Sequence, residues 1–406
     1  MGENFCMSKS VEWKKQDKIF CVLPFIQHYI STQGWSELCC DASYKGRDYE
    51  DKLDWNSKNL VKARKLFNEG KWPSECGFCI SREQQGGKSL RMLSNKQWQR
   101  EYDHFLNNPT VNPPLPISYD LRLGNFCNLE CVMCNPESSD KIGKSMNAYF
   151  GNKPNTIYDG DTSRSSDYTE KQMIDKILND PTNVKKIYLS GGEPFIMPGV
   201  LHLLEKLCSS GHSKHIKLHV STNATILRTD WVDKWFSKFA EVMLAMSIDA
   251  IGERAEYVRY GHKWSTVNRR IENIAKEIKT HHNVTLHIGA TVHAATVTQI
   301  KPLYEWAKNL RLGMDFHTVI TPEWLRPERA PDDIKQPVIE WIDSQPKHLM
   351  DYYRLTTVKN QLKLNANTTK EDLTQQHRYI RFLNATYPIK WKDAVPELKD
   401  WDPENQ

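Results

Sequence analysis

The stretch NFCNLECVMCNP, residues 125–136, places three cysteines, Cys127, Cys131 and Cys134, within eight positions. Iron–sulfur clusters and structural zinc sites usually take four protein ligands. The spacing Cys-x3-Cys-x2-Cys suits three thiolates that hold a [4Fe–4S] cluster from one tight loop, which leaves the fourth iron open to another ligand. The alternative is a zinc or ferredoxin-type site that takes a fourth cysteine from elsewhere in the chain.

The composition of the 406 residues limits the classes of protein. Lysine and arginine exceed acidic residues by 55 to 50, an excess too small to indicate nucleic acid as a partner. No apolar run approaches the ~20 residues of a membrane-spanning helix, and the polar start MGENFCMSKSVEWKKQDK lacks the apolar core of a secretory signal. We therefore expect a cytoplasmic protein without a membrane partner. In that reducing compartment, cysteines are typical of metal sites or catalysis rather than of disulfides.

A proline-rich linker, NNPTVNPPLP (107–116), separates an N-terminal segment (1–106) from a region in which short β-rich runs alternate with helical patterns (117–322). This alternation predicts a parallel sheet, open or curled into part of a barrel, with its ligand at the carboxyl ends of the strands. The polar stretch 137–170 is expected to be a long loop or lid, and residues 323–406 a helical tail. Strands are expected at 117–123, 185–190, 216–222, 241–249, 285–291 and 314–320, and helices at 199–209, 229–239, 265–280 and 298–309.

Polar motifs follow successive predicted strands after the cysteine triplet. LSGGEP (189–194) offers two glycines for close backbone approach and the carboxylate of Glu193 for an ammonium group. STNAT (221–225) carries hydroxyl and amide groups suited to a ribose. SIDA (247–250) is followed by EYVRYG (256–261), in which Arg259 suits a carboxylate. Each motif alone has an ordinary reading as a turn, a helix cap or a surface charge, but their recurrence at strand ends favours one binding site.

With these motifs, residues 117–320 resemble the radical SAM superfamily. The resemblance implies a partial (β/α)6 TIM-like barrel in which S-adenosylmethionine chelates the open iron of the cluster. Reductive cleavage of the cofactor then gives a 5′-deoxyadenosyl radical, which removes a hydrogen atom from substrate. It implies that Cys127, Cys131 and Cys134 ligate the [4Fe–4S] cluster. The implied contacts to S-adenosylmethionine are Gly191, Gly192 and Glu193 at the amino group, Ser221 and Asn223 at the ribose, Ser247 and Arg259 at the carboxylate, and Met133 where the family often has an aromatic residue against adenine.

A second cysteine group lies in the N-terminal segment, where Cys21, the pair Cys39/Cys40, Cys76 and Cys79 supply at least four thiols. Their spacing fits zinc and an iron–sulfur cluster equally well. Gly34-x4-Cys39 followed by Cys76-x2-Cys79 resembles the SPASM and twitch modules, which usually follow a radical SAM barrel but here precede it. The resemblance implies a closed auxiliary [4Fe–4S] cluster on Cys21, Cys39, Cys76 and Cys79, with Cys40 as the substitute for Cys39. A structural zinc is the alternative.

The resemblance defines the radical generator but not the substrate. We expect oxidation or crosslinking of a peptide or protein side chain, with the auxiliary cluster as electron acceptor and a flavodoxin or ferredoxin as electron donor. The first alternative is dehydrogenation or rearrangement of a sugar, aminocyclitol or nucleotide. A second class, a non-catalytic iron–sulfur or zinc protein that binds a partner, would not require GGEP or Arg259 at strand ends. No catalytic base can be named.

Overall fold

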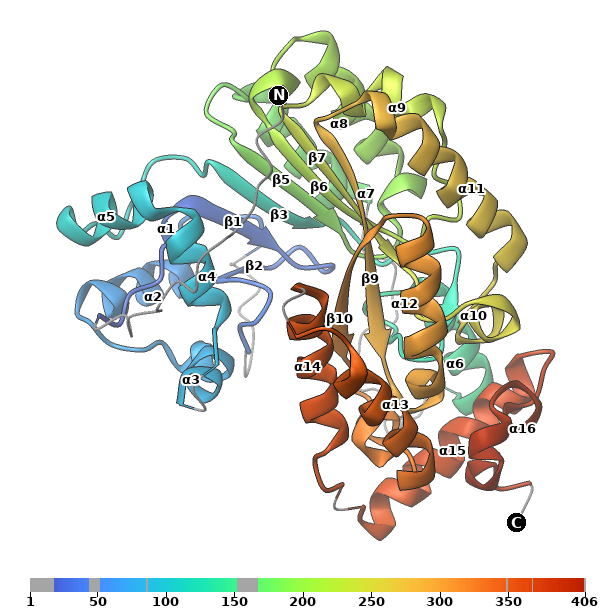
Figure 1. Cartoon of the computed structure of the whole chain (residues 1–406). Helices are drawn as coiled ribbons and strands as arrows, with labels where there is room; N and C mark the ends of the chain where they lie inside the picture. Colours follow the sequence, from blue (N-terminus) through green and yellow to red (C-terminus); the bar gives the residue numbers. More distant parts are fainter. Residues whose placement is uncertain are drawn as a thin grey trace. The chain divides into compact units, whose positions relative to one another are not determined.

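The computed structural model describes residues 18–43, 52–84, 87–151, 167–347, 350–366 and 368–404. The chain divides into two compact units, the first made of Met1–His28 with Ser36–Pro116 and the second of Tyr29–Trp35 with Ile117–Gln406. Figure 1 shows the elements of both. Cys6 and residues 159–166, at the centre of the expected loop, lie outside the described residues.

A sheet of parallel strands organises the second unit. Its strands pair in the order β10-β9-β7-β6-β5-β3, each parallel to its neighbour. All the strands predicted from the sequence are present, and the prediction of an α/β fold with parallel strands is confirmed. The strands are β3 (Ser118–Arg122), β5 (Lys186–Ser190), β6 (Lys217–Thr222), β7 (Glu241–Ser247), β9 (Val284–Val292) and β10 (Gly313–Thr318).

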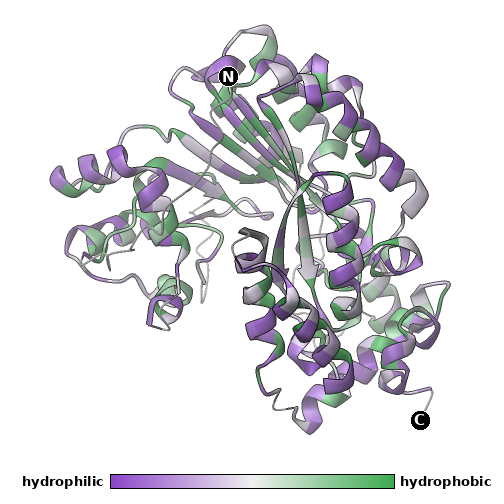
Figure 2. Ribbon diagram, in the orientation of Figure 1, coloured by the Kyte–Doolittle hydropathy of each residue, from purple (hydrophilic) through white to green (hydrophobic). Residues whose placement is uncertain are grey.

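The two faces of this sheet differ in burial. Along β6, β7 and β9, buried residues alternate with less buried ones, as expected when successive side chains point to opposite faces. Figure 1 shows helices along the outer side of the sheet, and Figure 2 shows hydrophilic residues on the outer faces of these helices. The predicted helices are found as α8 (Pro198–Ser209), α9 (Asp230–Lys234) with η5 (Phe236–Lys238), α11 (Trp264–Glu277) and α12 (Ile300–Asn309).

The prediction of a long loop over 137–170 is wrong for its first part, where helix α6 (Asp140–Phe150) forms. Ser139 caps this helix, because its hydroxyl accepts the amide of Ile142 at 3.4 Å. Ile142 and Met146 are buried, so one face of the helix packs although most of its residues are polar. A second helix, α7 (Asp167–Asn179), begins at the end of the same stretch.

The C-terminal region is mostly helical, as predicted. It contains α13 (Asp332–Ser344), α14 (Met350–Leu362), α15 (Lys370–Thr386) and α16 (Trp391–Ala394), followed by the 3-10 helix η10 (Pro396–Trp401). Three of its aromatic residues, Tyr379, Phe382 and Trp391, are fully buried. These rings therefore belong to a packed core.

The first unit is a small helical body with a buried arginine at its centre. Arg64 donates hydrogen bonds to the carbonyl oxygens of Pro24, Trp55 and Val111 at 2.7, 2.8 and 3.1 Å. An aromatic cluster that includes Phe20 and Phe25 packs beside it. Its elements are α1 (Leu23–Ile26), the first part of β1 (Gln27–Ile30), β2 (Ser36–Glu37), α2 (Lys58–Asn68), η2 (Ser74–Cys76), α3 (Gly77–Gln84), α4 (Leu90–Gln97) and α5 (Gln99–Asn107).

Among the described residues, no helix combines the length and the apolar character that crossing a bilayer requires.

Candidate cluster and cofactor site

The cysteine triplet lies on the loop that follows the carboxyl end of β3. Cys131 ends the short strand β4 (Glu130–Cys131), which pairs antiparallel with β8 (Arg259–Tyr260). A tight turn closes the triplet, because the amide of Cys134 donates to the carbonyl of Cys131 at 2.9 Å. Met133 lies in this turn and is half-buried. The loop is therefore built from defined backbone contacts, and its three thiols come from eight consecutive residues.

Helix α6 fixes the loop from one side. Asp140, in its first turn, accepts the amide of Cys127 at 3.1 Å, and its own amide donates to the carbonyl of Asn125 at 2.7 Å. Ser139 donates its hydroxyl to the carbonyl of Leu129 at 2.8 Å. These bonds use the first residues of α6 to hold both ends of the segment that contains Cys127.

The three thiols have raised pKa values. Burial and, to a smaller extent, the neighbouring charge of Cys127 raise the pKa of Cys134 to about 12. Burial also raises the pKa of Cys131 well above its usual range, with contributions from both other thiols, and that of Cys127. Because metal ligands must be deprotonated, loading this loop with metal releases protons.

Arg259 reaches the triplet from β8. Its guanidinium makes a bidentate pair with Asp249, in which Nε donates to Oδ2 at 2.7 Å and Nη2 donates to Oδ1 at 3.0 Å. The remaining nitrogen, Nη1, lies 3.9 Å from Sγ of Cys131. Asp249 is 3% exposed and also accepts the amide of Thr291 at 2.7 Å. The positive charge of Arg259 lowers the pKa of the Cys131 thiol and thereby favours its thiolate.

The two glycines of the GGEP motif serve close backbone packing against the cysteine loop. The amide of Gly192 donates to the carbonyl of Gly124 at 2.8 Å, and the amide of Glu193 to that of Phe126 at 2.9 Å. A Cβ at Gly192 would lie 2.1 Å from the carbonyl oxygen of Phe126. Gly191 has a φ of +119°, and a Cβ there would lie 2.7 Å from the oxygen of Gly124. The sequence predicted that these glycines let the backbone approach a ligand. In the structure they also let the backbone pack against the cysteine loop, where a side chain would not fit.

The carboxylate of Glu193 is fully buried and holds the end of β6. It accepts the hydroxyl of Thr222 and the amide of Asn223, both at 2.7 Å, and the amide of Phe195 at 3.2 Å. Burial raises its pKa, while these bonds oppose the rise. A carboxylate offers about four acceptor positions, so these three bonds leave one for a ligand.

The motif after β6 connects to the cysteine loop through side-chain amides. Asn223 donates to Oδ1 of Asn128 at 2.8 Å, and Asn128 donates to the hydroxyl of Thr225 at 2.8 Å. Ser221 lies 2.8 Å from the hydroxyl of Tyr188 on the adjacent strand. Ser247 ends β7 and pairs with Gly289 of β9. The residues predicted for the cofactor thus come from neighbouring strand ends of one edge of the sheet.

Several residues of this site were not found from the sequence. Asp249 lies within the quoted SIDA motif, but its pairing with Arg259 depends on helix α10 (Gly252–Val258), which returns the chain to the loop. Tyr188 and His219 are in register on β5 and β6, on the less buried face of the sheet. Their rings contact each other in a tilted arrangement, with centroids 4.5 Å apart. Nε2 of His219 is buried without a hydrogen-bond partner in the described part of the chain, and burial lowers its pKa to about 4. The period-2 pattern could have placed both residues on this face.

The cysteines of the first unit gather at one place. Cys21 precedes α1, Cys39 follows β2, Cys76 ends η2 and Cys79 lies in α3. Each of the four interacts electrostatically with at least one other, and burial raises the pKa of all four, that of Cys21 to about 12. Cys40 is exposed, and its thiol lies 3.9 Å from Asp41.

One compact group of potential metal-binding side chains lies outside both cysteine groups. Within the described residues, one group of three or more His, Cys, Asp or Glu side chains has all its ligand atoms within 4.8 Å of one another, namely Asp233, Glu277 and His281. Neither cysteine group meets that limit.

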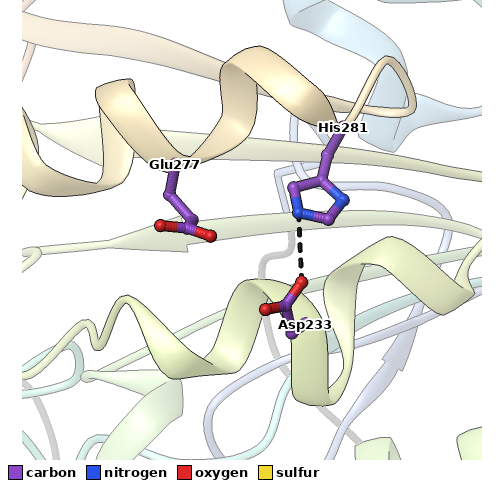
Figure 3. A group of neighbouring side chains, drawn as sticks. All are labelled: Asp233, Glu277 and His281. Carbon is purple, nitrogen blue, oxygen red and sulfur yellow. Dashed lines mark ion pairs between the residues drawn. The ribbon is translucent and has the colours of Figure 1, made fainter.

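Figure 3 shows Asp233, Glu277 and His281, with an ion pair of 3.1 Å between His281 and Asp233. Asp233 precedes β7 and His281 precedes β9, so this group lies at the amino ends of the strands, opposite the candidate site. The Asp233 side chain is 72% exposed, as is usual for a surface ion pair.

The segment that contains the candidate site is similar to a known protein family. Residues 121–298 match the model of the Radical SAM superfamily. This match contains the cysteine triplet, the GGEP motif and Arg259. No curated protein matches the chain.

Similar solved structures include anSMEcpe with bound AdoMet, at 22% identity and a TM-score of 0.35, where the match covers 49% of this chain and 50% of that chain. SuiB of Streptococcus suis bound to the precursor peptide SuiA matches at 12% identity and a TM-score of 0.39, over 79% of this chain and 73% of that one. SuiB bound to S-adenosylmethionine matches at 14% identity and a TM-score of 0.38, over 73% and 68%. The chain thus spans about half the length of anSMEcpe, and scores this low establish no shared substrate.

Proposed function

Because residues 121–298 form a radical SAM superfamily domain, we propose that the protein is a radical SAM enzyme that cleaves S-adenosylmethionine reductively. Cys127, Cys131 and Cys134 would hold the [4Fe–4S] cluster. When bound, the cluster and S-adenosylmethionine supply a 5′-deoxyadenosyl radical for removal of a hydrogen atom from substrate. The electron donor would be a flavodoxin or ferredoxin.

The observation that carries this proposal is the incomplete thiol set of the second unit. Three cysteines lie on one loop at the strand edge where α/β folds bind ligands. The remaining cysteine among the described residues of this unit, Cys208, is on α8 and contacts the carbonyl of Trp235 at 3.7 Å. A site with three protein ligands keeps one coordination position for a further ligand.

The proposed contacts to S-adenosylmethionine are supported by their common position at the carboxyl ends of neighbouring strands. Gly191, Gly192 and Glu193 follow β5, Ser221 and Asn223 lie at the end of β6, and Ser247 ends β7. Arg259 is held by Asp249 with one nitrogen directed at the Cys131 thiol. It would therefore stabilise negative charge at the cluster and at the carboxylate of the cofactor together. Met133 would pack on the adenine ring.

We propose an auxiliary [4Fe–4S] cluster in the first unit on Cys21, Cys39, Cys76 and Cys79. Cys39 is half-buried whereas Cys40 is exposed, which supports Cys39 as the ligand. Arg91 lies close enough to lower the pKa of Cys21 and of Cys76, so it would offset part of the cluster's negative charge. Four protein ligands would make this cluster an electron acceptor rather than a substrate site.

The substrate that we propose is a peptide or protein side chain, which the enzyme would oxidise or crosslink. Support comes from hydrogen-bonding groups on the less buried face of the sheet, where Tyr188 and His219 lie next to the end of β6 that carries Ser221. His219 is neutral at pH 7, because its pKa is about 4, and can accept a hydrogen bond or a proton. The same groups suit the hydroxyls of a sugar, aminocyclitol or nucleotide, which is our second candidate.

Iron analysis tests the metal content. Anaerobic reconstitution should give about eight irons per chain, and changing Cys127, Cys131 and Cys134 to alanine should leave about four. The reduced wild type should show an electron paramagnetic resonance signal that changes when S-adenosylmethionine is added. A protein that binds zinc or two closed clusters would show no such change, which would favour a non-catalytic iron–sulfur or zinc protein.

Deuterium transfer tests the substrate class. Deuterated peptides should pass deuterium into 5′-deoxyadenosine, whereas sugars and nucleosides should not. Transfer from sugars alone would overturn the peptide proposal and support the second candidate. His219→Ala should reduce the transfer without changing the iron content.

A further inference from the structure

The C-terminal region lies outside the matched family segment, yet it contacts the cysteine loop directly. Tyr379, on α15, donates its hydroxyl to the carbonyl of Val132 at 2.7 Å. Tyr387, which follows α15, donates its hydroxyl to the carbonyl of Glu130. Val132 and Glu130 are the two neighbours of Cys131 in the sequence. Two hydroxyls from the C-terminal region thus hold the peptide group that precedes Cys131, a proposed cluster ligand, and the peptide group that follows Val132.

Both tyrosines are buried in a fixed setting. Tyr379 is 0% and Tyr387 is 4% exposed. The ring of Tyr387 stacks on Tyr260 with centroids 4.5 Å apart and an angle of 30°. Tyr260 is paired with Glu130 across β8 and β4. The backbone of β8 therefore holds Glu130 and Cys131 along one side, and tyrosine hydroxyls hold the carbonyls of Glu130 and Val132.

Helix α15 is itself anchored to the helix that follows the cysteine loop. Phe382 packs against Phe150 of α6 with centroids 5.5 Å apart, and the guanidinium of Arg378 lies 4.8 Å from the same ring. At the other end, Asn384 donates to the buried carboxylate of Asp402 at 3.0 and 3.1 Å. None of these contacts of α15 involves a residue of the cysteine loop.

We propose that Tyr379 and Tyr387 are positioning residues that hold Cys131 in the geometry needed to retain the [4Fe–4S] cluster. This inference rests on the proposed function. A hydrogen bond to a buried carbonyl restricts rotation of its peptide group, and without the donor the carbonyl seeks another partner. The peptide group between Cys131 and Val132 is held separately, because the amide of Val132 donates to the carbonyl of Val258 at 2.9 Å. With this amide and both carbonyls bound, the Cys131 thiol cannot turn away from the loop by a peptide rotation. The C-terminal region therefore controls how readily the cluster is lost.

The test compares Tyr379→Phe, Tyr387→Phe and the double variant with wild type. Tyr257→Phe is the matched control. Tyr257 is also buried, at 2% exposed, and its ring centroid lies 5.5 Å from that of Tyr387. Its hydroxyl, however, has no hydrogen-bond partner among the described residues. One readout is the rate at which a ferrous chelator removes iron from the protein whose first-unit cysteines are changed to alanine. The second is amide hydrogen exchange of residues 127–134 in the metal-free protein, relative to exchange in β6 and β7.

Each hydroxyl removed should speed iron release about fivefold and raise exchange in the loop alone, since a hydrogen bond of ordinary strength corresponds to about that factor. Tyr257→Phe should match wild type in both readouts. Equal rates in all variants would overturn the inference, as would a rise in exchange that is uniform over the loop, β6 and β7, because that pattern means general destabilisation. If wild type takes up no cluster, the proposed function fails, while the exchange measurement still tests the tyrosines.

Discussion

At the scale of single residues, the pair of Asp249 and Arg259 is a defining feature of the candidate site. Asp249 is 3% exposed and binds Arg259 with two hydrogen bonds. Removing one member of such a pair leaves a buried charge without its partner. We expect Asp249→Ala to lower the free energy of unfolding of the metal-free protein by about 3–5 kcal/mol in urea titrations.

The exposed pair of Arg228 and Asp230 is the control for this prediction. Its two bonds, at 2.9 and 3.0 Å, have nearly the same geometry, but both side chains are more than half exposed. Asp230→Ala should change the free energy of unfolding far less than Asp249→Ala does, because water screens an exposed pair. Similar losses for the two variants would show that burial does not strengthen the Asp249–Arg259 pair.

Two glycines of the site are expected to have different roles, one in packing of the backbone and one in binding of the cofactor. Gly192→Ala would place a Cβ 2.1 Å from a backbone oxygen, so we expect more than about 4 kcal/mol of destabilisation, at the upper end for single substitutions. Gly289 pairs with Ser247, one of the proposed cofactor contacts, and a Cβ at Gly289 would have no atom within 4 Å. Gly289→Ala should therefore leave urea unfolding unchanged and weaken S-adenosylmethionine binding in calorimetry. Unchanged binding would remove Gly289 from the cofactor site.

At the scale of elements, the sequence predicted the strands because their apolar alternation is local information. Helix α6 was missed because its residues are mostly polar, and only Ile142 and Met146 mark its buried face. The strand-end motifs were found because parallel strands bring their carboxyl ends to one edge. Their bonding to one another, such as Glu193 with Thr222, depends on the register of neighbouring strands, which the sequence of one chain does not specify.

The junction between β9 and η7 (Ala294–Gln299) should make stability depend on pH. His293 is 0% exposed there, and burial lowers its pKa to about 4 from 6.5. Between about pH 6.5 and pH 4, His293 is protonated in the unfolded chain but mostly neutral in the folded chain. The free energy of unfolding therefore falls as the pH is lowered toward 4. Asp120, whose pKa burial raises to about 6, has the opposite sign and offsets part of this loss.

We expect His293→Asn to remove about 2–3 kcal/mol of the stability difference between pH 7 and pH 4.5. Urea titrations of the metal-free protein at the two pH values measure this difference. His215→Asn, at an exposed position, is the control and should keep the wild-type difference. If both variants retain the wild-type pH dependence, His293 does not carry it.

At the scale of the whole molecule, the two units are expected to hold metal independently. Arg64 donates to three backbone carbonyls in the first unit and is fully buried, so Arg64→Met should disrupt that unit. Reconstituted Arg64→Met should retain about four irons, all in the second unit, whereas wild type has about eight. Lys65→Ala, at an exposed neighbouring position, should keep all of them. Loss of all iron in Arg64→Met would mean that the units fold together.

Long-range contacts were beyond prediction from the sequence. The tail was expected to be helical, which it is, but Tyr379 and Tyr387 contact the cysteine loop across separations of 247 and 257 residues. No local pattern encodes such a contact, because it arises only once α15 packs on α6. The proposed ligand residues, in contrast, carry their chemistry in their type and spacing, so the sequence alone is enough to propose them.

The central claim is that the cysteine loop activates S-adenosylmethionine, and the most direct measurement is 5′-deoxyadenosine formation by the anaerobically reconstituted protein with dithionite. The account predicts 5′-deoxyadenosine and methionine in equal amounts from wild type. The variant with Cys127, Cys131 and Cys134 changed to alanine should form neither. A wild-type protein that carries its full iron content and forms no more 5′-deoxyadenosine than this variant would contradict the account.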